Sequence, residues 1–126
     1  MLPEDSPGQV VHGDLSGNVL FAPGMAPGVI DFTPYWRPAL FSQAVVVVDA
    51  LLWHAAPASL VAAVPGVRRT SVLARAALFR LIASDRLALG KPPQAAERYA
   101  RAEARSHLRV LDLLDSDQPV PGRSSR

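Results

Sequence analysis

The sequence contains no cysteine and only one lysine, Lys91. The lack of cysteine excludes a disulfide framework and a zinc site built on thiolates. The N-terminal residues do not show the basic and then apolar order of a signal peptide. The longest apolar runs, such as residues 44–48, are much too short to span a bilayer. We therefore expect a soluble, cytoplasmic protein that has no membrane partner.

Two nucleotide-binding motifs are also missing. Neither G-x-G-x-x-G nor G-x-x-x-x-G-K-[ST] occurs, and Lys91 stands between a glycine and a proline rather than in a strand. The basic residues are scattered along the sequence and the net charge is only +2, so we expect no nucleic-acid partner. Apolar residues make up 49% of the 126 residues, which is typical of one globular domain.

Short β-type segments occupy the first third of the chain. Residues 10–11 read as a buried strand, and residues 19–21 and 29–30 read as two further strands. The connection 22–28 holds two prolines and two glycines, which indicates a loop that joins an antiparallel pair. Such a hairpin would bring polar side chains on both sides of it to one end.

Three of these polar side chains carry oxygen ligands. Asn18 precedes the hairpin, Asp31 follows it, and Asp14 lies in the turn that leads into it. Two carboxylates and one carboxamide form a hard oxygen set, which suits Mg²⁺ better than zinc. The sequence therefore predicts a magnesium site made by Asp14, Asn18 and Asp31.

The same residues carry a resemblance to a known family. Residues 12–15 (His-Gly-Asp-Leu), Asn18 and residues 30–32 (Ile-Asp-Phe) resemble the catalytic core of the aminoglycoside phosphotransferases and choline kinases, which have the protein-kinase-like fold. The run through Thr-Pro-Tyr-Trp-Arg-Pro looks most like an actinobacterial branch of these enzymes. The resemblance covers about residues 9–56.

The resemblance implies a role for each matching residue. Asp14 would be the base that orients the acceptor hydroxyl, Asn18 and Asp31 would hold Mg²⁺ on the phosphates of ATP, and His12 would support the loop. ATP would be the co-substrate and a small molecule with a hydroxyl group the acceptor. The family has four residues between the Asp and the Asn, whereas this chain has three.

The segment that follows, residues 33–38, contains two prolines, and we expect no regular structure there. In the resemblance it faces the acceptor, so Tyr35, Trp36 and Arg37 are possible substrate contacts. The alternative is that the two aromatic side chains cover the edge of the core and the arginine is solvated.

The remainder of the chain reads as helical. Residues 44–53 are apolar apart from Asp49, and their four valines favour a strand. The length of the segment 40–56 favours a buried helix instead, and a helix is what the resemblance implies here. In the resemblance Asp49 braces the backbone of the catalytic loop, and the alternative is a helix N-cap. Further helices are expected over residues 70–89, where Arg80 reads as solvated, and over residues 94–114. The inward face of the last helix is predicted to hold Ala100, Ala104, Leu108, Leu111 and Leu114.

These observations predict a mainly α fold with a small β-hairpin sheet, which is the C-terminal lobe of a kinase-like fold. Its parts would be a frayed start (1–8), a lobe (9–115) with a catalytic hairpin (9–32) and a helical part (40–115), and a disordered tail (116–126). The nucleotide-covering N-terminal lobe, with its strand lysine, would have to come from missing sequence.

The predicted function is phosphotransfer from ATP to a small-molecule hydroxyl by an incomplete catalytic lobe. The alternative is an inactive, truncated lobe that acts as a non-catalytic partner module. A metallophosphatase is disfavoured because Ser16 stands where a metal-binding histidine is needed and the later motifs of that class are missing.

Overall fold

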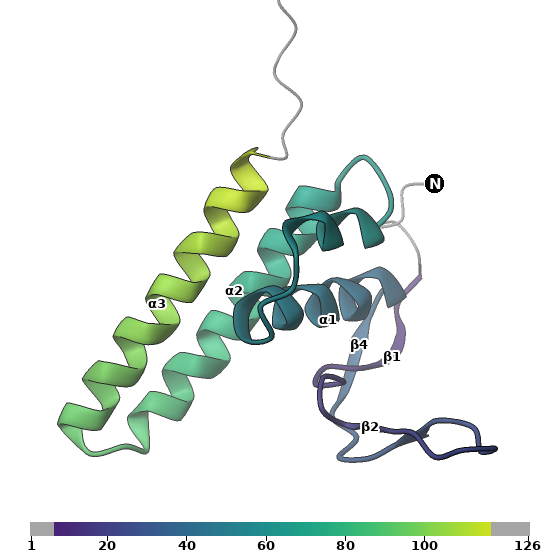
Figure 1. Cartoon of the computed structure of the whole chain (residues 1–126), viewed down its shortest axis with the longest axis horizontal. Helices are drawn as coiled ribbons and strands as arrows, with labels where there is room; N and C mark the ends of the chain where they lie inside the picture. Colours follow the sequence, from purple (N-terminus) through teal and green to yellow (C-terminus); the bar gives the residue numbers. More distant parts are fainter. Residues whose placement is uncertain (1–6, 117–126) are drawn as a thin grey trace, which may run out of the picture.

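Three long helices lie beside two small antiparallel sheets in the computed structural model, which describes residues 7–116 (Figure 1). The elements in chain order are β1 (Gln9–His12), β2 (Val19–Leu20), β3 (Gly28–Val29), β4 (Pro34–Arg37), α1 (Ala39–Trp53), the 3₁₀ helix η2 (Ala58–Ala63), α2 (Arg69–Leu89) and α3 (Pro93–Ser116). The prediction of a mainly α fold with a small hairpin sheet is confirmed. The predicted frayed start and tail fall, apart from residues 7, 8 and 116, outside the described residues.

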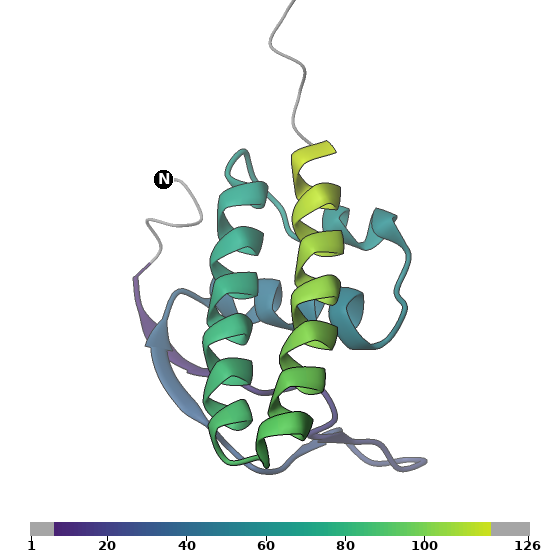
Figure 2. The same ribbon diagram turned by 90° about the vertical axis from the view of Figure 1, so that its left-hand side faces the viewer.

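The predicted hairpin is present as strands β2 and β3. They pair antiparallel, with Val19 opposite Val29 and Leu20 opposite Gly28. The connecting loop includes Gly24 at a φ of 73°, a conformation that glycine adopts without steric cost. The hairpin projects away from the helices (Figures 1 and 2). Most of its residues are exposed.

The prediction that residues 33–38 lack regular structure is wrong, because β4 pairs with β1. Pro34 lies opposite His12 at the end of the ladder, and Pro38 comes directly after the strand. Prolines at the ends of a strand in a two-stranded sheet remove no central ladder hydrogen bond. The pairing places Tyr35 opposite Val11 and fixes this segment against the start of the loop that carries Asp14.

Helix α1 forms the centre of the core and crosses behind α2 and α3 (Figure 2). Its valines favour strands by propensity, but Val45 and Val48 are almost completely buried, and packing overrides that preference. The buried apolar residues that form this core are Ala44, Val45, Val47, Val48, Leu51, Leu52, Val61, Val64, Val72, Leu73, Ala76, Ala77, Val110 and Leu114.

Helices α2 and α3 run antiparallel and lie side by side in both views (Figures 1 and 2). The predicted inward face of α3 is mostly wrong. Leu114 is buried, but the other four predicted residues are exposed, and His107 and Val110 are buried instead. Helix α3 covers the core with a narrow line of contact, which leaves Leu108 60% exposed and Leu111 45% exposed. No helix among residues 7–116 combines the length and apolar character needed to cross a bilayer.

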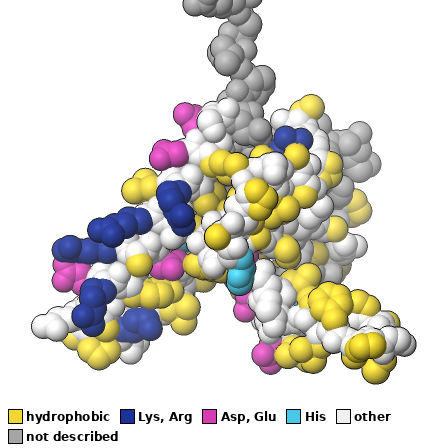
Figure 3. Space-filling view, viewed as in Figure 1, with side chains coloured by type: hydrophobic (Ala, Val, Ile, Leu, Met, Phe, Trp, Pro, Cys, Tyr) yellow, Lys and Arg dark blue, Asp and Glu magenta, His cyan; other side chains and the backbone are white. Residues whose placement is uncertain are grey.

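Basic side chains are less scattered in space than along the sequence. Four arginines recur every three or four residues on the exposed side of α3, where Figure 3 shows a row of basic groups. They are Arg98, Arg101, Arg105 and Arg109. Arg101 forms an ion pair with Glu97 one turn away, which partly neutralises the row.

Candidate functional site

The turn after β1 depends on a glycine. The amide of Gly13 donates to the carbonyl of Thr33 at 2.9 Å, and the ring of Tyr35 lies directly against the Gly13 backbone. A Cβ at position 13 would overlap that ring, so no larger residue fits without a shift. The close approach holds the loop that carries Asp14 against β4.

The imidazole of His12 joins the Asp14 loop to the segment beyond the hairpin. Its Nδ1 accepts a hydrogen bond from the Asp14 amide at 3.0 Å, and its Nε2 donates to the Ile30 carbonyl at 3.2 Å. The two partners together require the tautomer that carries its proton on Nε2. His12 is only 8% exposed, and its own carbonyl accepts from Ser42 of α1 at 2.7 Å. The His12 side chain is therefore placed to support the Asp14 loop from inside.

Asn18 ties the same two segments together from the base of the hairpin. Its side-chain Nδ2 donates to the Asp14 carbonyl at 2.7 Å, and its backbone carbonyl accepts from the Ile30 amide at 3.0 Å. Since the amide nitrogen is engaged, the side-chain Oδ1 is the atom able to bind a cation. The loop of residues 15–17 is therefore closed by a hydrogen bond to the Asp14 backbone.

Asp31 follows directly and has an unusual backbone conformation. Its φ is 50°, in the left-handed region that Asp and Asn tolerate better than most residues. Thr33 Oγ1 donates to the Asp31 carbonyl at 3.1 Å and helps to hold that conformation. Next to it, the ring of Phe32 meets His12 edge-on at 5.5 Å between centroids. The Asp31 side chain is exposed, as a cation site requires.

The segments that carry Asp14, Asn18 and Asp31 are therefore joined to one another by direct hydrogen bonds. The side-chain oxygen atoms of these three residues are of the kind that Mg²⁺ prefers. Among residues 7–116 no group of three His, Cys, Asp or Glu side chains gathers as a metal site. A cation here would thus depend on two carboxylates, the Asn18 amide and ligands from outside the chain.

Arg80 of α2 connects the exposed carboxylate of Asp14 to the buried carboxylate of Asp49. Its Nε and Nη2 donate to the two oxygens of Asp49, each at 2.6 Å, and Nη2 also lies 3.0 Å from Asp14 Oδ1. The Asp49 side chain is 0% exposed, whereas that of Asp14 is 51% exposed. Burial lowers the pKa of Arg80, but hydrogen bonding and attraction from Asp49, then from Asp14, outweigh this and raise it above its usual value.

Two sequence-based interpretations are corrected here. Arg80 is not solvated but only 7% exposed, and Asp49 is not an N-cap, because it lies within α1 ten residues after its start. Asp49 is connected to the loop that carries Asp14 through Arg80. One signal pointed to this pairing: Arg80 continues a buried line from Leu73 and Ala77 on α2, and a buried Asp49 needs a cationic partner.

The three predicted substrate contacts have different neighbours. Tyr35 packs edge-on against Phe79, with ring centroids 5.3 Å apart, and against Gly13. Trp36 is 67% exposed and lies over Gly8. Arg37 lines a separate apolar hollow.

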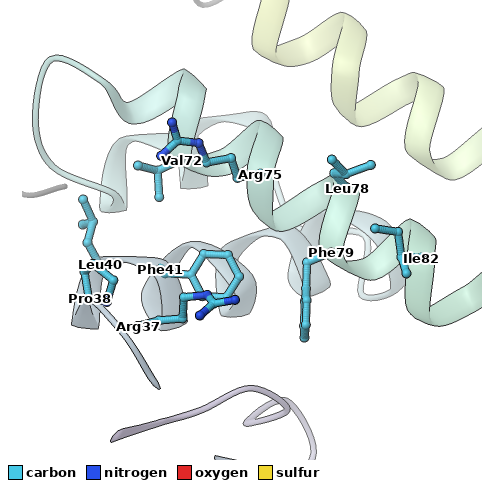
Figure 4. A pocket seen from close by; sticks show the side chains of 9 residues that line it. All are labelled: Arg37, Pro38, Leu40, Phe41, Val72, Arg75, Leu78, Phe79 and Ile82. Carbon is cyan, nitrogen blue, oxygen red and sulfur yellow. The ribbon is translucent and has the colours of Figure 1, made fainter. Parts of the chain in front are cut away.

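That hollow, of about 370 Å³, lies between β4, the start of α1 and α2. Figure 4 shows Leu40 and Phe41 on one side of it and Phe79, Leu78 and Ile82 on the other. None of Asp14, Asn18 and Asp31 is among its lining residues. Asp14 instead lines a second hollow, between the C-terminal end of α1, α2 and the start of α3.

Comparison with protein-family models, with curated proteins and with solved structures finds no match to this chain. The assignment of a function therefore rests on these residues and their geometry.

Proposed function

We propose that this chain is the catalytic lobe of a phosphotransferase that moves the γ-phosphate of ATP to a hydroxyl group of a small molecule. The observation that carries the proposal is the bridge made by His12, which hydrogen-bonds both the Asp14 amide and the Ile30 carbonyl. This bridge joins the loop that carries the Asp14 carboxylate, which is suited to act as a general base, to the segment that carries Asp31. Asn18 hydrogen-bonds the same two segments.

Asp14 is the residue that acts on the acceptor. Its Oδ1 is held by Arg80 at 3.0 Å, so Oδ2 is the oxygen that accepts the hydrogen bond of the substrate hydroxyl. As the hydroxyl oxygen forms its bond to the γ-phosphorus, the bond from that phosphorus to the ADP oxygen breaks. The hydroxyl proton passes to Asp14, a transfer worth about 10² to 10⁴ in rate.

Asn18 Oδ1 and the Asp31 carboxylate are the groups that would hold Mg²⁺ against the phosphates. The metal would supply neutralisation of the charge that develops on the transferring group. The chain contributes orientation: the Asn18 backbone is hydrogen-bonded to Ile30, and the strained backbone of Asp31 is held by Thr33.

The projecting hairpin supports the view that a second wall completes this site. Figure 3 shows hydrophobic side chains gathered on it, and its large apolar residues are more than 40% exposed. They are Leu20, Phe21, Met25, Val29, Ile30 and Phe32. Exposed apolar patches of this kind mark interaction surfaces. We propose that a nucleotide-binding lobe covers it.

The same patch favours a second candidate function, a non-catalytic partner module. In that case the apolar hairpin would bind another chain, and the ion pair between Arg80 and Asp14 would serve the fold alone. The two candidates differ in one property: only the catalytic lobe needs a cation at Asp31.

Paramagnetic relaxation with Mn²⁺, a substitute for Mg²⁺, tests this on the 126-residue chain. We expect Mn²⁺ to broaden the amide signals of residues 14, 18 and 31 first, and Asp31→Asn to abolish that selectivity. Asparagine tolerates the left-handed backbone, so this variant removes charge while keeping the turn. Asp112→Asn, an exposed position on α3, is the matched control. Broadening spread evenly over all acidic residues would reject the proposal that the chain is a catalytic lobe.

A further inference from the structure

The hollow beside Asp14 has a volume of about 470 Å³, which lies in the range of small-molecule sites. The residues that line it are Asp14, Trp53, Arg80, Ala83, Ser84, Arg86, Leu87 and Tyr99. They come from the catalytic loop, the end of α1, α2 and the start of α3. A group bound in this hollow would therefore lie directly against the carboxylate to which we assign the base.

Two aromatic side chains supply much of its wall, and both are fixed by neighbours. Trp53 is 44% exposed, its Nε1 donates to Glu103 at 3.3 Å, and its ring lies over the Arg80 guanidinium at 5.7 Å. Tyr99 has Lys91 over its ring at 5.0 Å. Leu87 is 64% exposed and completes the apolar part of the wall. Aromatic faces held in this way can stack on a flat ring without a large entropy cost.

The charges around this hollow balance. Of the charged groups that line it or touch its lining side chains, three are acidic and three are basic. The acidic ones are Asp14, Asp49 and Glu103, and the basic ones are Arg80, Arg86 and Lys91. Because charges of both signs surround the hollow and several are paired with one another, it has no concentrated charge of one sign to attract an ion. Shape and stacking are left to select the ligand.

We propose that this hollow is the acceptor site and that it takes an uncharged alcohol carried on a flat, mostly apolar ring. The proposal rests on the proposed function and adds the class of its acceptor. The ring stacks against Trp53 and Leu87, and its hydroxyl reaches Asp14 Oδ2. This places the acceptor away from Trp36 and Arg37, the contacts that the sequence suggested.

Chemical-shift mapping by NMR on the full chain provides the test, with 2-phenylethanol as the probe. We expect it to shift the indole signal of Trp53 and the amides of residues 14, 83 and 87, with a dissociation constant on the order of 10 mM for a ligand of this size. Choline, a cationic alcohol, and glycolate, an anionic one, should bind at least about tenfold more weakly.

Paired variants separate the two possible acceptor positions. Trp53→Leu should weaken 2-phenylethanol about tenfold or more, while Trp36→Leu should leave it unchanged. Leu87→Glu is a second variant, because an exposed position tolerates the change while a carboxylate in the wall repels an apolar ring. The opposite pattern, with loss in Trp36→Leu alone, overturns the proposal, and so do shifts confined to the hollow near Arg37.

The Mn²⁺ experiment keeps the two proposals distinguishable. Selective broadening at Asp31 without any ring alcohol in this hollow would overturn the acceptor assignment and leave phosphotransfer standing. A ring alcohol in the hollow without selective Mn²⁺ broadening would keep the binding site and overturn phosphotransfer as its purpose.

Discussion

Arg80 donates to both carboxylate oxygens of Asp49 at 2.6 Å, in a pair whose acidic side chain is 0% exposed. A buried bidentate pair of this kind costs desolvation of both ions, and good geometry offsets that cost. Since Arg80 also holds Asp14, the pair links the centre of the core to the proposed base. The integrity of the site and the stability of the fold should thus depend on the same guanidinium.

Removing one member of the Arg80–Asp49 pair should lower the free energy of unfolding far more than removing both. We expect Arg80→Met to lower the free energy of unfolding by about 3–5 kcal/mol, because it leaves the Asp49 carboxylate buried and unpaired. The double variant Asp49→Leu with Arg80→Met should recover most of that loss. Urea unfolding measures both, and Arg105→Met, at an exposed position on α3, should change stability by less than about 0.5 kcal/mol.

The pH dependence of this pair follows from the raised pKa of Arg80. A group whose pKa is raised on folding gives its full contribution below its unfolded pKa and loses it only as the pH rises through the folded value. The contribution of Arg80 should therefore be constant from about pH 6 to pH 9. If the destabilisation caused by Arg80→Met decreased as the pH was raised through this window, the pairing would be contradicted.

His12→Phe should loosen the catalytic loop while keeping an aromatic ring in place. The substitution leaves the Asp14 amide and the Ile30 carbonyl without their partner, at an expected cost of about 1–3 kcal/mol in the free energy of unfolding. Amide hydrogen exchange at Asp14 should become faster. His54→Phe, at the exposed end of α1, is the control and should affect neither measurement. Unchanged exchange at Asp14 would show that the imidazole does not hold the loop.

If the loop presents Asn18 Oδ1 to the metal, Asn18→Ala should raise the Mg²⁺ concentration needed for phosphotransfer in a protein that includes the proposed nucleotide-binding lobe. The measurement is the initial rate as a function of Mg²⁺ concentration, with Ser16→Ala of the same loop as control. An identical titration in both variants would leave Asn18 as a turn residue, a role that asparagine also favours.

The 126-residue chain by itself should bind Mg-ATP weakly. Its proposed metal ligands lie on an exposed edge beside an uncovered apolar hairpin, where water screens their attraction for phosphate. Calorimetry should show no binding tighter than about millimolar, equivalent to roughly 4 kcal/mol. Micromolar binding that is lost in Asp31→Ala would mean that no second wall is needed.

His107→Leu should stabilise the protein. The Nδ1 of His107 hydrogen-bonds the Glu103 carbonyl at 2.8 Å, but its Nε2 is buried and has no hydrogen-bond partner among the described residues. Replacing an unsatisfied buried nitrogen by an apolar group should raise the free energy of unfolding by up to about 1 kcal/mol, measured in urea. A loss of more than 1 kcal/mol would indicate that Nε2 has a partner such as a buried water.

Local signals in the sequence were enough to place two of the helices and the hairpin. Residues 70–89 and 94–114 are long enough, and patterned well enough, for their type to be read without tertiary information, whereas the valines of residues 40–56 left a strand open and the helix there was favoured by length and by the resemblance. The prolines and glycines of the loop 22–28 likewise fixed the pairing of β2 with β3. The prediction that Asp14, Asn18 and Asp31 lie at one end of that hairpin followed from the same local pattern.

The features that only the tertiary structure decided are contacts between residues far apart in the chain. The pairing of β1 with β4 makes a strand of a proline-flanked segment, and the meeting of α1 with α2 makes Arg80 the buried partner of Asp49. Helical periodicity places an arginine on a face but does not say which helix will cover that face. Burial and pairing depend on that second surface, and so the residues that hold Asp14 in place could be identified only after the chain had folded.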